Sequence, residues 1–305
     1  MTFDSRPLSD ENLTDVVAFM RRANPFAQHT WGWDTGRFVD WRWGGNTLRE
    51  SESPGWFADH CAVFRDGNTI RALAIAEYGR ADVCVVTPGE DPAAIRFALR
   101  YLVAQRNEAE LNFEVLDDPT WLTSIFQEVG FVERSNTGNE WEYELATAEA
   151  PVSVPDGFSI ETLGDDRSSD YDGITECIRQ AFNSTHDVAA ALSSLESNPM
   201  FRPELSVFIR SPDGRIAAYC RGTVDPDNGI CGIDPVCTHP DFQRMGLGTA
   251  AVRSCFDTQR QLGGKFSYIG SAPEPAPGTH LYRALGPSSV AVYSSWSRPG
   301  SGATS

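Results

Sequence analysis

The chain of 305 residues is nearly free of lysine, since Lys265 is the single lysine among 25 basic residues. Acidic residues number 42, so the formal net charge at pH 7 is −17. Nucleic acids and anionic membranes both bind basic surfaces, and this balance disfavours them as partners. Loss of lysine together with an excess of acid is typical of a halophilic protein, because high salt screens the self-repulsion. A GC-rich genome that prefers arginine codons is the alternative explanation.

Long apolar runs and paired cysteines are also missing. No run approaches the roughly 18 residues that cross a membrane. The N-terminal MTFDSRPLSDENL has no basic stretch followed by an apolar core, so we expect no secretory signal and a cytoplasmic protein. The seven cysteines are scattered without a CxxC pair, which argues against a disulfide framework and a structural zinc site. We therefore expect buried thiols and no metal.

The length of the chain and its apolar content of 41% are sufficient for two globular domains. The clearest boundary is ATAEAPVSVPDG at 146–157, a segment of small residues and proline between structured runs. We predict a first domain over residues 1–147, a linker over 148–157, a second domain over 158–298 and a tail over 299–305.

Both sides of this boundary show the same order of predicted elements. Apolar spacing in the second half predicts strands and helices in the order 158–163, 170–182, 187–197, 205–210, 215–224, 228–240, 249–261, 265–270, 279–285 and 289–296. The first half repeats this outline at 13–23, 60–66, 67–78, 82–88, 91–105, 111–116 and 119–130, and ends in a hairpin over 131–146. Asp91 is the predicted N-cap of its helix, with Pro92 at the first position. The fold class is therefore α+β, with two tandem domains that each have a mixed central sheet flanked by helices.

One glycine turn stands directly before a helix, in HPDFQRMGLG at 239–248. A loop that leads into a helix start collects free backbone N–H groups beside the positive end of the helix dipole, which favours phosphate. Gly246 and Gly248 remove side chains, so the backbone can approach an anion closely. The spacing matches neither the P-loop nor the dinucleotide-binding motif, and the turn alone is equally consistent with simple packing.

The run VCTHPDFQRMGLGTAAV resembles the acetyl-CoA-binding motif of the GNAT superfamily of acyltransferases, with Gln243, Gly246 and Gly248 at its defining positions. Downstream, HLYRALG resembles the LYxxxGF motif of the same family, with Tyr282 four residues before Gly286. The resemblance implies a GNAT fold for the second half, acetyl-CoA as co-substrate and an amine as acceptor.

The resemblance also implies roles for individual residues. The pyrophosphate of coenzyme A is expected on the loop and helix start, and the pantetheine arm along a strand that separates from its neighbour. The corresponding residues are Val236, Cys237, Thr238, Gln243, Arg244, Met245, Gly246, Leu247, Gly248 and Thr249. Tyr282 would protonate the departing thiolate, and Asp234 is the best-placed acid to take a proton from the amine.

Each assignment has a structural alternative. Tyr282 would otherwise pack a helix against the sheet, and Asp234 would otherwise cap a bulge before Pro235. Cys237 is expected to be an inert buried thiol rather than a nucleophile. His239 is interpreted as a turn residue before Pro240. Pro275 stands where many relatives carry a cofactor-binding asparagine, which is a departure from the motif.

The first half lacks the equivalents of both motifs. Phe126 stands four residues before Gly130 and has no hydroxyl to donate, and VTPGEDPAAIRF places Glu90 and Asp91 where the glycine loop would be. Acidic side chains repel a pyrophosphate. The first half is therefore interpreted as a degenerate GNAT copy that has lost cofactor binding.

A tryptophan-rich segment, WGWDTGRFVDWRWGGN at 31–46, permits two interpretations. Its aromatic residues either pack a helix on the sheet or form an aromatic wall over the acceptor pocket, suited to a cation or a sugar face. The residues predicted for such a wall are Trp31, Trp33, Trp41 and Trp43.

The leading function is an N-acetyltransferase for a small-molecule amine. The alternatives are a non-catalytic acetyl-CoA-binding or scaffolding protein of the same fold, and acetylation of a peptide N-terminus, for which we expect an open groove between the halves. Sheet edges and exposed aromatic residues would also allow a homodimer.

Overall fold

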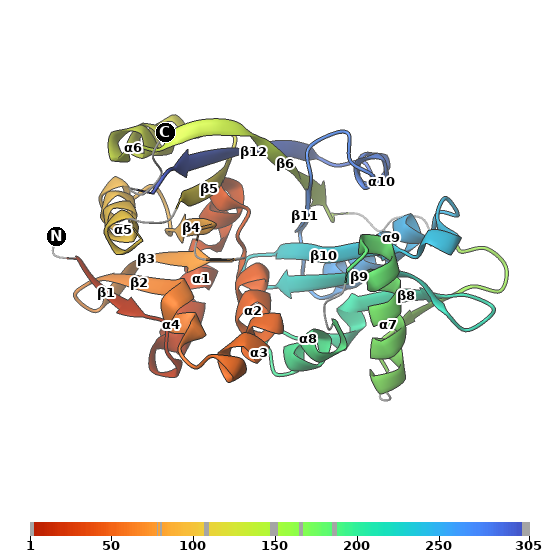
Figure 1. Cartoon of the computed structure of the whole chain (residues 1–305). Helices are drawn as coiled ribbons and strands as arrows, with labels where there is room; N and C mark the ends of the chain where they lie inside the picture. Colours follow the sequence, from red (N-terminus) through yellow and green to blue (C-terminus); the bar gives the residue numbers. More distant parts are fainter. Residues whose placement is uncertain are drawn as a thin grey trace.

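The computed structural model describes residues 3–77, 79, 81–106, 110–146, 152–164, 167–184 and 188–300 (Figure 1). The elements of the first half are β1 (Phe3–Pro7), α1 (Asp10–Trp31), α2 (Thr35–Trp43), α3 (Gly45–Glu52), α4 (Trp56–His60), β2 (Cys61–Asp66), β3 (Thr69–Ala76), β4 (Val83–Val86), α5 (Pro92–Gln105), β5 (Leu111–Leu116), α6 (Thr120–Val129) and β6 (Val132–Glu144).

The second half repeats this order without counterparts of α3 and α4. Its elements are β7 (Ser159–Thr162), α7 (Arg167–Phe182), α8 (Val188–Leu195), β8 (Ser206–Arg210), β9 (Ile216–Asp225), β10 (Ile230–Thr238), α9 (Leu247–Gln261), β11 (Phe266–Ser271), α10 (Thr279–Ala284) and β12 (Ser289–Arg298), with 3₁₀ turns at Pro203–Leu205 and Pro240–Phe242. The predicted repetition of one α+β design is confirmed.

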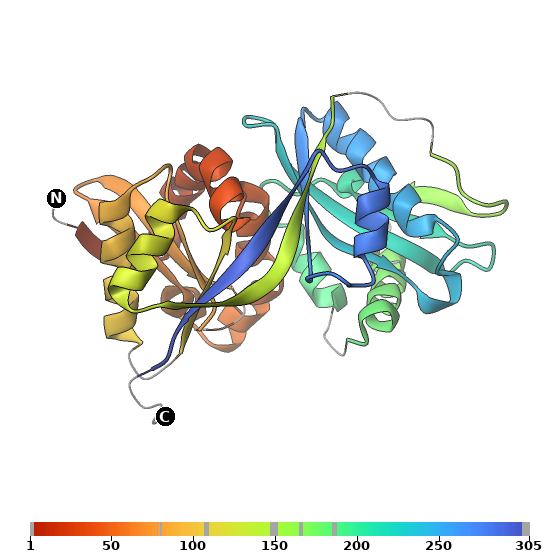
Figure 2. The ribbon, with the colours of Figure 1, turned by 90° about the horizontal axis from the view of Figure 1, so that it is seen from above.

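The last strand of each half pairs with the other half. The sheet order is β1-β2-β3-β4 for the first four strands and β5-β12-β6-β11-β10-β9-β8-β7 for the rest. The final strand β12 therefore lies beside β5 of the first half, and β6 lies beside β11 of the second half; both pairings are antiparallel. Figure 2 shows these two strands crossing together between the two lobes. Part of the predicted linker lies outside the described residues, and the boundary itself stays a prediction.

The exchange places large side chains in the opposite core. Trp296 of β12 is 3% exposed and packs against Phe126 of the first half, with 5.5 Å between ring centroids. Tyr143 of β6 packs against Phe256 of α9, with 4.9 Å between ring centroids. Burying an aromatic side chain is worth about 1.5–3 kcal/mol. Separating the halves would expose such residues on both sides, so the exchange holds the two lobes together.

The hairpin predicted over 131–146 is wrong, because β6 is one continuous strand. The turn-like sequence SNTGN lies inside it, where β6 pairs with β12 on one edge and with β11 on the other. A Cβ atom at Gly138 would lie 2.5 Å from the carbonyl oxygen of Ser271. Gly138 therefore permits close approach of a neighbouring chain segment and does not form a turn.

The remaining core follows from local sequence. Every residue of β9 is buried, and both α7 and α9 pack on β9 and β10. Asp91 caps α5 as predicted, by accepting a hydrogen bond from the N–H of Ala94, and Pro92 occupies the first turn. All seven cysteines are free and buried. No helix in the described part of the chain is both long enough and apolar enough to span a membrane.

Candidate active site

The glycine loop leads directly into α9. Residues 243–246 are exposed, and Arg244 and Gly246 have positive φ angles of 62° and 80°. None of the described side chains caps the first turn of α9, so its N–H groups and the positive end of the helix dipole are available to an anion. The loop therefore has the conformation that an anion site requires.

Glycine is required at the two positions of this loop for different structural reasons. Gly246 faces open space, and its left-handed backbone disfavours other residue types. A Cβ atom at Gly248 would lie 2.9 Å from both Leu281 Cδ1 and Thr238 Oγ1. Gly248 therefore lets α9 approach β10 and α10 closely. The sequence had suggested a different role for this glycine, in which the missing side chain leaves space for an anion.

We expect Gly248→Ala to lower the free energy of unfolding by about 1–3 kcal/mol, because the added methyl group overpacks this contact. Urea unfolding would measure the change. Gly89→Ala is the control, since Gly89 has open space around it and no left-handed backbone, and it should change stability by less than about 0.5 kcal/mol. Equal stability of the two variants would show that the side chains of Leu281 and Thr238 move away from the added methyl group without lowering the free energy of unfolding.

The strands β10 and β11 pair over three residues and then separate. The parallel pairing covers Ile230–Gly232 on β10, whereas β10 continues to pair with β9 as far as Thr238. The pairing with β9 is irregular between Ile233 and Val236, around Asp234. Beyond Gly232, the edge of β10 that faces β11 pairs with no strand in the described part of the chain, and this is the separation that the resemblance implies.

Tyr282 lies on α10, beside this separation. Its ring packs near Trp141 of β6, with 6.2 Å between ring centroids, and its backbone carbonyl accepts a hydrogen bond from the hydroxyl of Tyr143. Burial raises the pKa of the Tyr282 hydroxyl, and the neighbouring Cys220, Asp234 and Cys237 raise it further. The hydroxyl is therefore protonated at neutral pH and suited to donate a proton toward β10.

Asp234 and Cys237 differ in what surrounds them. The side chain of Asp234 is open to a cavity, but the surrounding protein raises its pKa by desolvation, partly offset by Arg221 and Arg37. A raised pKa makes this carboxylate a stronger base than an ordinary aspartate. Cys237 is buried, and its contact with Cys177, at 3.7 Å between sulfur atoms, raises the pKa of its thiol. Cys237 is therefore a buried thiol with a raised pKa, which argues against a nucleophilic role.

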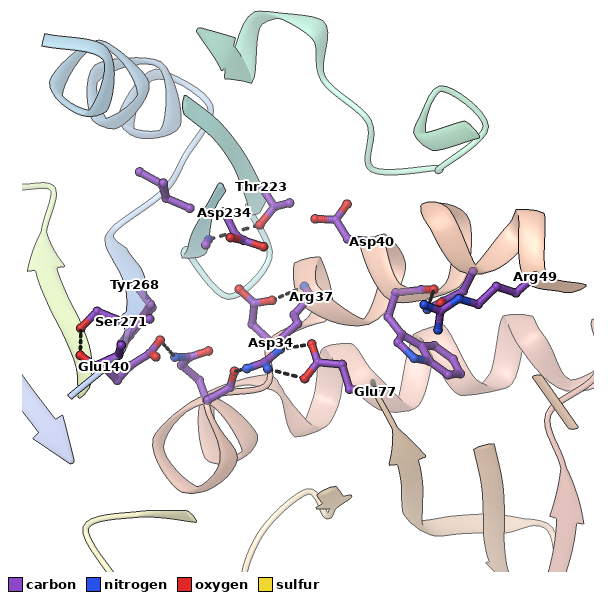
Figure 3. Close-up of a pocket in the computed structure, with 18 residues that line it drawn as sticks. Asp34, Arg37, Asp40, Arg49, Glu77, Glu140, Thr223, Asp234, Tyr268 and Ser271 are labelled. Atoms are coloured by element: carbon purple, nitrogen blue, oxygen red, sulfur yellow. Dashed lines mark hydrogen bonds and ion pairs between the residues drawn. The ribbon is translucent and has the colours of Figure 1, made fainter. Parts of the chain in front are cut away.

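A cavity of about 600 Å³ lies between the two halves at the separation of β10 and β11 (Figure 3). Its walls come from α1, α2, α3 and β6 of the first half and from β9, β10 and β11 of the second. The lining residues are Gln28, Gly32, Asp34, Arg37, Asp40, Trp41, Asn46, Arg49, Glu77, Glu140, Thr223, Gly232, Ile233, Asp234, Tyr268, Gly270, Ser271 and Ala272. Five of them are carboxylic acids and two are arginines.

Two of these carboxylates are matched by arginines. Arg221 of β9 donates to both oxygens of Asp40, at 3.1 and 2.6 Å, and the pair is largely buried. Arg37 donates to both oxygens of Glu77 in the same way. Bidentate pairs of this kind fix the geometry of both side chains. They therefore brace the cavity wall and leave little charge for a ligand.

Asp34 and Glu140 have no cationic partner of this kind among the described residues. Asp34 caps α2 through the N–H of Arg37, whereas Glu140 accepts from Gln28 Nε2 and from the Tyr293 hydroxyl. Burial raises the pKa of the Asp34 carboxyl to about 6 and that of Glu140 to about 7. Within the described chain, no cluster of His, Cys, Asp or Glu has the arrangement of a metal site.

The family model described as "Acetyltransferase (GNAT) family" matches residues 172–286, which include the glycine loop and Tyr282. This C-terminal half is a GNAT acetyltransferase domain. The family implies an acyl-CoA co-substrate and an acceptor.

Solved structures extend the likeness to the whole chain. A tandem GNAT protein from the clavulanic acid biosynthesis pathway has a TM-score of 0.63 and 13% identity, with 99% of this chain and 100% of that chain covered. A GCN5-related N-acetyltransferase from Sphaerobacter thermophilus has a TM-score of 0.59 and 14% identity, with 98% and 96% covered. At this identity the likeness shows the fold, which is that of tandem GNAT proteins. No curated protein matches the chain.

The first half differs from the second at both motif positions. The carboxylate of Asp91 occupies the start of α5 and is paired with Arg71, whereas the start of α9 has no cap. Phe126 is fully buried in the aromatic core, and it has no hydroxyl. Both features fit a copy without a bound pyrophosphate.

The predicted aromatic wall is reduced to one residue. Trp41 lines the cavity, but Trp31 packs in the core against Phe113 and Phe126, and Trp43 is a partly buried neighbour of that core. Trp33 is also in the core, with the guanidinium of Arg37 over its ring at 4.9 Å. Large apolar rings gain more from burial in the core than from lining a polar cavity.

The cavity residues that the sequence interpretation missed are Asp34, Arg37, Asp40, Glu77, Glu140 and Tyr268. Three of them lie in the tryptophan-rich segment, where Asp34, Arg37 and Asp40 follow one another at three-residue spacing. This spacing places the three charged side chains on one face of a helix. It is the sequence pattern from which a charged cavity wall could have been predicted. Glu140 had no comparable signal, because it reaches the site through the strand exchange.

Proposed function

We propose that the chain is an acetyl-CoA-dependent N-acetyltransferase that acetylates a primary amine of a small molecule by direct attack in the C-terminal GNAT domain. The carrying observation is the cavity at the separation of β10 and β11, with Asp234 in its wall and Tyr282 beside the same strand. Its volume of about 600 Å³ suits a small acceptor. A peptide acceptor would favour an open groove, and the cavity therefore supports the small molecule.

Acetyl-CoA would bind to the glycine loop and to β10. The uncapped first turn of α9, with Gln243 and Arg244, fits a pyrophosphate, and the unpaired edge of Val236–Thr238 fits the amide groups of a pantetheine arm. When bound, it supplies an acetyl thioester, which is the electrophile for a neutral amine.

The residues of the chain would then manage two protons. Asp234 accepts a proton from the attacking nitrogen of the neutral amine as that nitrogen forms the new bond to the acetyl carbon. The bond from that carbon to sulfur breaks, and Tyr282 Oη donates its proton to the leaving sulfur. The products are the acetamide and the thiol of coenzyme A, and solvent restores the protonation of both residues.

A calorimetric titration with acetyl-CoA is expected to give one site per chain. The reason is the contrast between the uncapped α9 and the start of α5, which the carboxylate of Asp91 fills. The titration is done in molar salt, because the acidic composition supports a cytoplasmic protein from a salt-rich cell. Arg244→Ala is a second measurement and should weaken binding, since Arg244 contributes a charge at the loop.

The stoichiometry decides between the alternatives. Two sites per chain would show that the first copy still binds the co-substrate. Absence of binding would overturn the proposed function and leave the glycine loop as a packing turn. One site, followed by amine-dependent release of thiol, would support the proposal.

A further inference from the structure

We propose that the acceptor carries a second cationic group, and that Asp34 and Glu140 bind it while the reacting amine lies at Asp234. The class of acceptor is a small diamine or polyamine. This inference rests on the proposed function, because it names the substrate of the same cavity.

Asp34 and Glu140 stand at the two strands whose separation forms the site. A Cβ atom built at Gly232 of β10 would lie 3.1 Å from Asp34 Oδ2, and one at Gly270 of β11 would lie 3.5 Å from Glu140 Oε2. Both acids come from the first half of the chain, one from the start of α2 and the other from the exchanged strand β6. Figure 3 shows them around the same part of the cavity as Asp234.

The charges of the cavity are unevenly compensated. Asp40 and Glu77 are neutralised by Arg221 and Arg37, and Arg49 lies over the ring of Trp56. Asp34 and Glu140 are 4% and 7% exposed, and among the described residues the hydrogen bonds that they accept come from uncharged groups, namely a backbone N–H, an amide and a hydroxyl. Buried carboxylates are costly unless a cation is present, so this part of the cavity favours a positively charged ligand group.

The titration behaviour of the two acids agrees with this geometry. Burial is the largest cause that raises the pKa of Asp34, to about 6, and that of Glu140, to about 7. The charge of Arg37 lowers the pKa of both acids, and the charges of Asp40 and Asp225 raise the pKa of Asp34. An ammonium group placed between them would favour the ionised form of both acids.

The spacing along β10 sets the length of the acceptor. Gly232, whose side-chain position Asp34 Oδ2 approaches, precedes Asp234 by two residues, or about 6–7 Å along a strand. An extended chain covers this distance in about five or six bonds. Two nitrogens separated by four or five carbons therefore match the two positions.

The test compares acceptors that share a four-carbon chain, with 1,4-diaminobutane against butylamine and 4-amino-1-butanol, by initial rates of thiol release. We expect kcat/KM for the diamine to exceed that for either monoamine by at least about tenfold, since close charge pairs in desolvated sites are coupled at least this strongly. Asp34→Asn and Glu140→Gln should each remove most of this advantage, mainly through KM, so that the ratio of kcat/KM for the diamine to that for butylamine falls toward one. Glu114→Gln, an exposed acid on β5, is the matched control.

The variants and a binding measurement keep the inference separable from the proposed function. Equal rates for diamine and monoamines, or equal losses for both in Asp34→Asn, would overturn the inference while the enzyme remains. Calorimetric binding of 1,4-diaminobutane without turnover would support the inference and overturn the proposed activity. Failure of the diamine to bind to a protein that binds acetyl-CoA would overturn the inference alone.

Discussion

Tyr282→Phe is expected to lower kcat by about 10²- to 10³-fold, which is the usual contribution of a positioned proton donor. The affinity for acetyl-CoA should stay unchanged, because phenylalanine removes one hydroxyl and leaves the ring. Burial raises the pKa of the Tyr282 hydroxyl, which therefore still carries its proton at neutral pH when the departing sulfur needs one.

The surroundings of Tyr282 should survive this substitution. The contact of its ring with Trp141 does not involve the hydroxyl, and the hydrogen bond from Tyr143 goes to the backbone carbonyl of residue 282. The position of α10 is therefore preserved, and a loss of turnover would report on the missing proton donor rather than on a displaced helix.

Initial rates and calorimetry on the same preparation would test this expectation. Tyr171→Phe is the matched control, since its hydroxyl bonds to Glu196 on the surface of the second half, away from the separation of β10 and β11. Full activity of Tyr282→Phe would remove this residue from the mechanism. A wild-type protein that binds acetyl-CoA and acetylates no amine would instead be the non-catalytic binder.

Asp34→Asn is expected to raise the free energy of unfolding by up to about 3 kcal/mol at pH 8 in the absence of an acceptor, since each pH unit of difference between folded and unfolded pKa corresponds to about 1.4 kcal/mol. The folded pKa is about 6 against an ordinary 3.8. Burial raises the pKa of the Asp34 carboxyl. The charges of Asp40 and Asp225 raise this pKa further, and Arg37 lowers it. Asparagine caps a helix as well as aspartate does, so the hydrogen bond to α2 is retained.

The sign of the pH dependence follows from proton binding. Between about pH 4 and pH 6 the folded protein holds a proton on Asp34 that the unfolded chain has lost, so the wild type loses stability as pH rises through this window. Asparagine does not titrate. The gain in Asp34→Asn should therefore be complete above pH 6 and vanish near pH 4.

Urea unfolding at pH 4.5 and pH 8 would measure this difference. Asp241→Asn is the control of opposite sign, because the hydrogen bond from Arg215 lowers the pKa of that exposed carboxyl, and its removal should slightly destabilise the protein at pH 8. Destabilisation of Asp34→Asn at both pH values would identify Asp34 as a structural acid. If Asp34→Asn is more stable than the wild type and also loses its selectivity for the diamine, then the Asp34 carboxylate lowers folding stability and contributes to acceptor binding.

Features that depend on neighbouring residues were predictable from the sequence. The cap of Asp91 and the position of Pro92 fixed the start of α5, and the glycine loop fixed that of α9. The repeated order of elements, the GNAT motifs and the lost hydroxyl at Phe126 are likewise visible in the chain itself. They are local because capping, turn geometry and apolar periodicity act within a few residues.

The acidic character of the cavity was only partly predictable. The segment at 31–46 was interpreted through its tryptophans, whose large apolar surfaces belong to the core, while Asp34 and Asp40 on the same segment face the cavity. The net charge of −17 indicated an acidic protein but gave no position for the charge.

Tertiary contacts decided the rest. The helix α1 continues through Pro25, where a helix is expected to end, and the side chain of Asn228 donates to the carbonyl of Arg21, four residues before the proline. Likewise Glu140 reaches the cavity because β6 pairs with β11 instead of folding back as a hairpin. The sequence by itself determined the family, the repeated order and the catalytic candidates of the second half. The acceptor cavity was decided by contacts between residues more than a hundred positions apart, which no local pattern encodes.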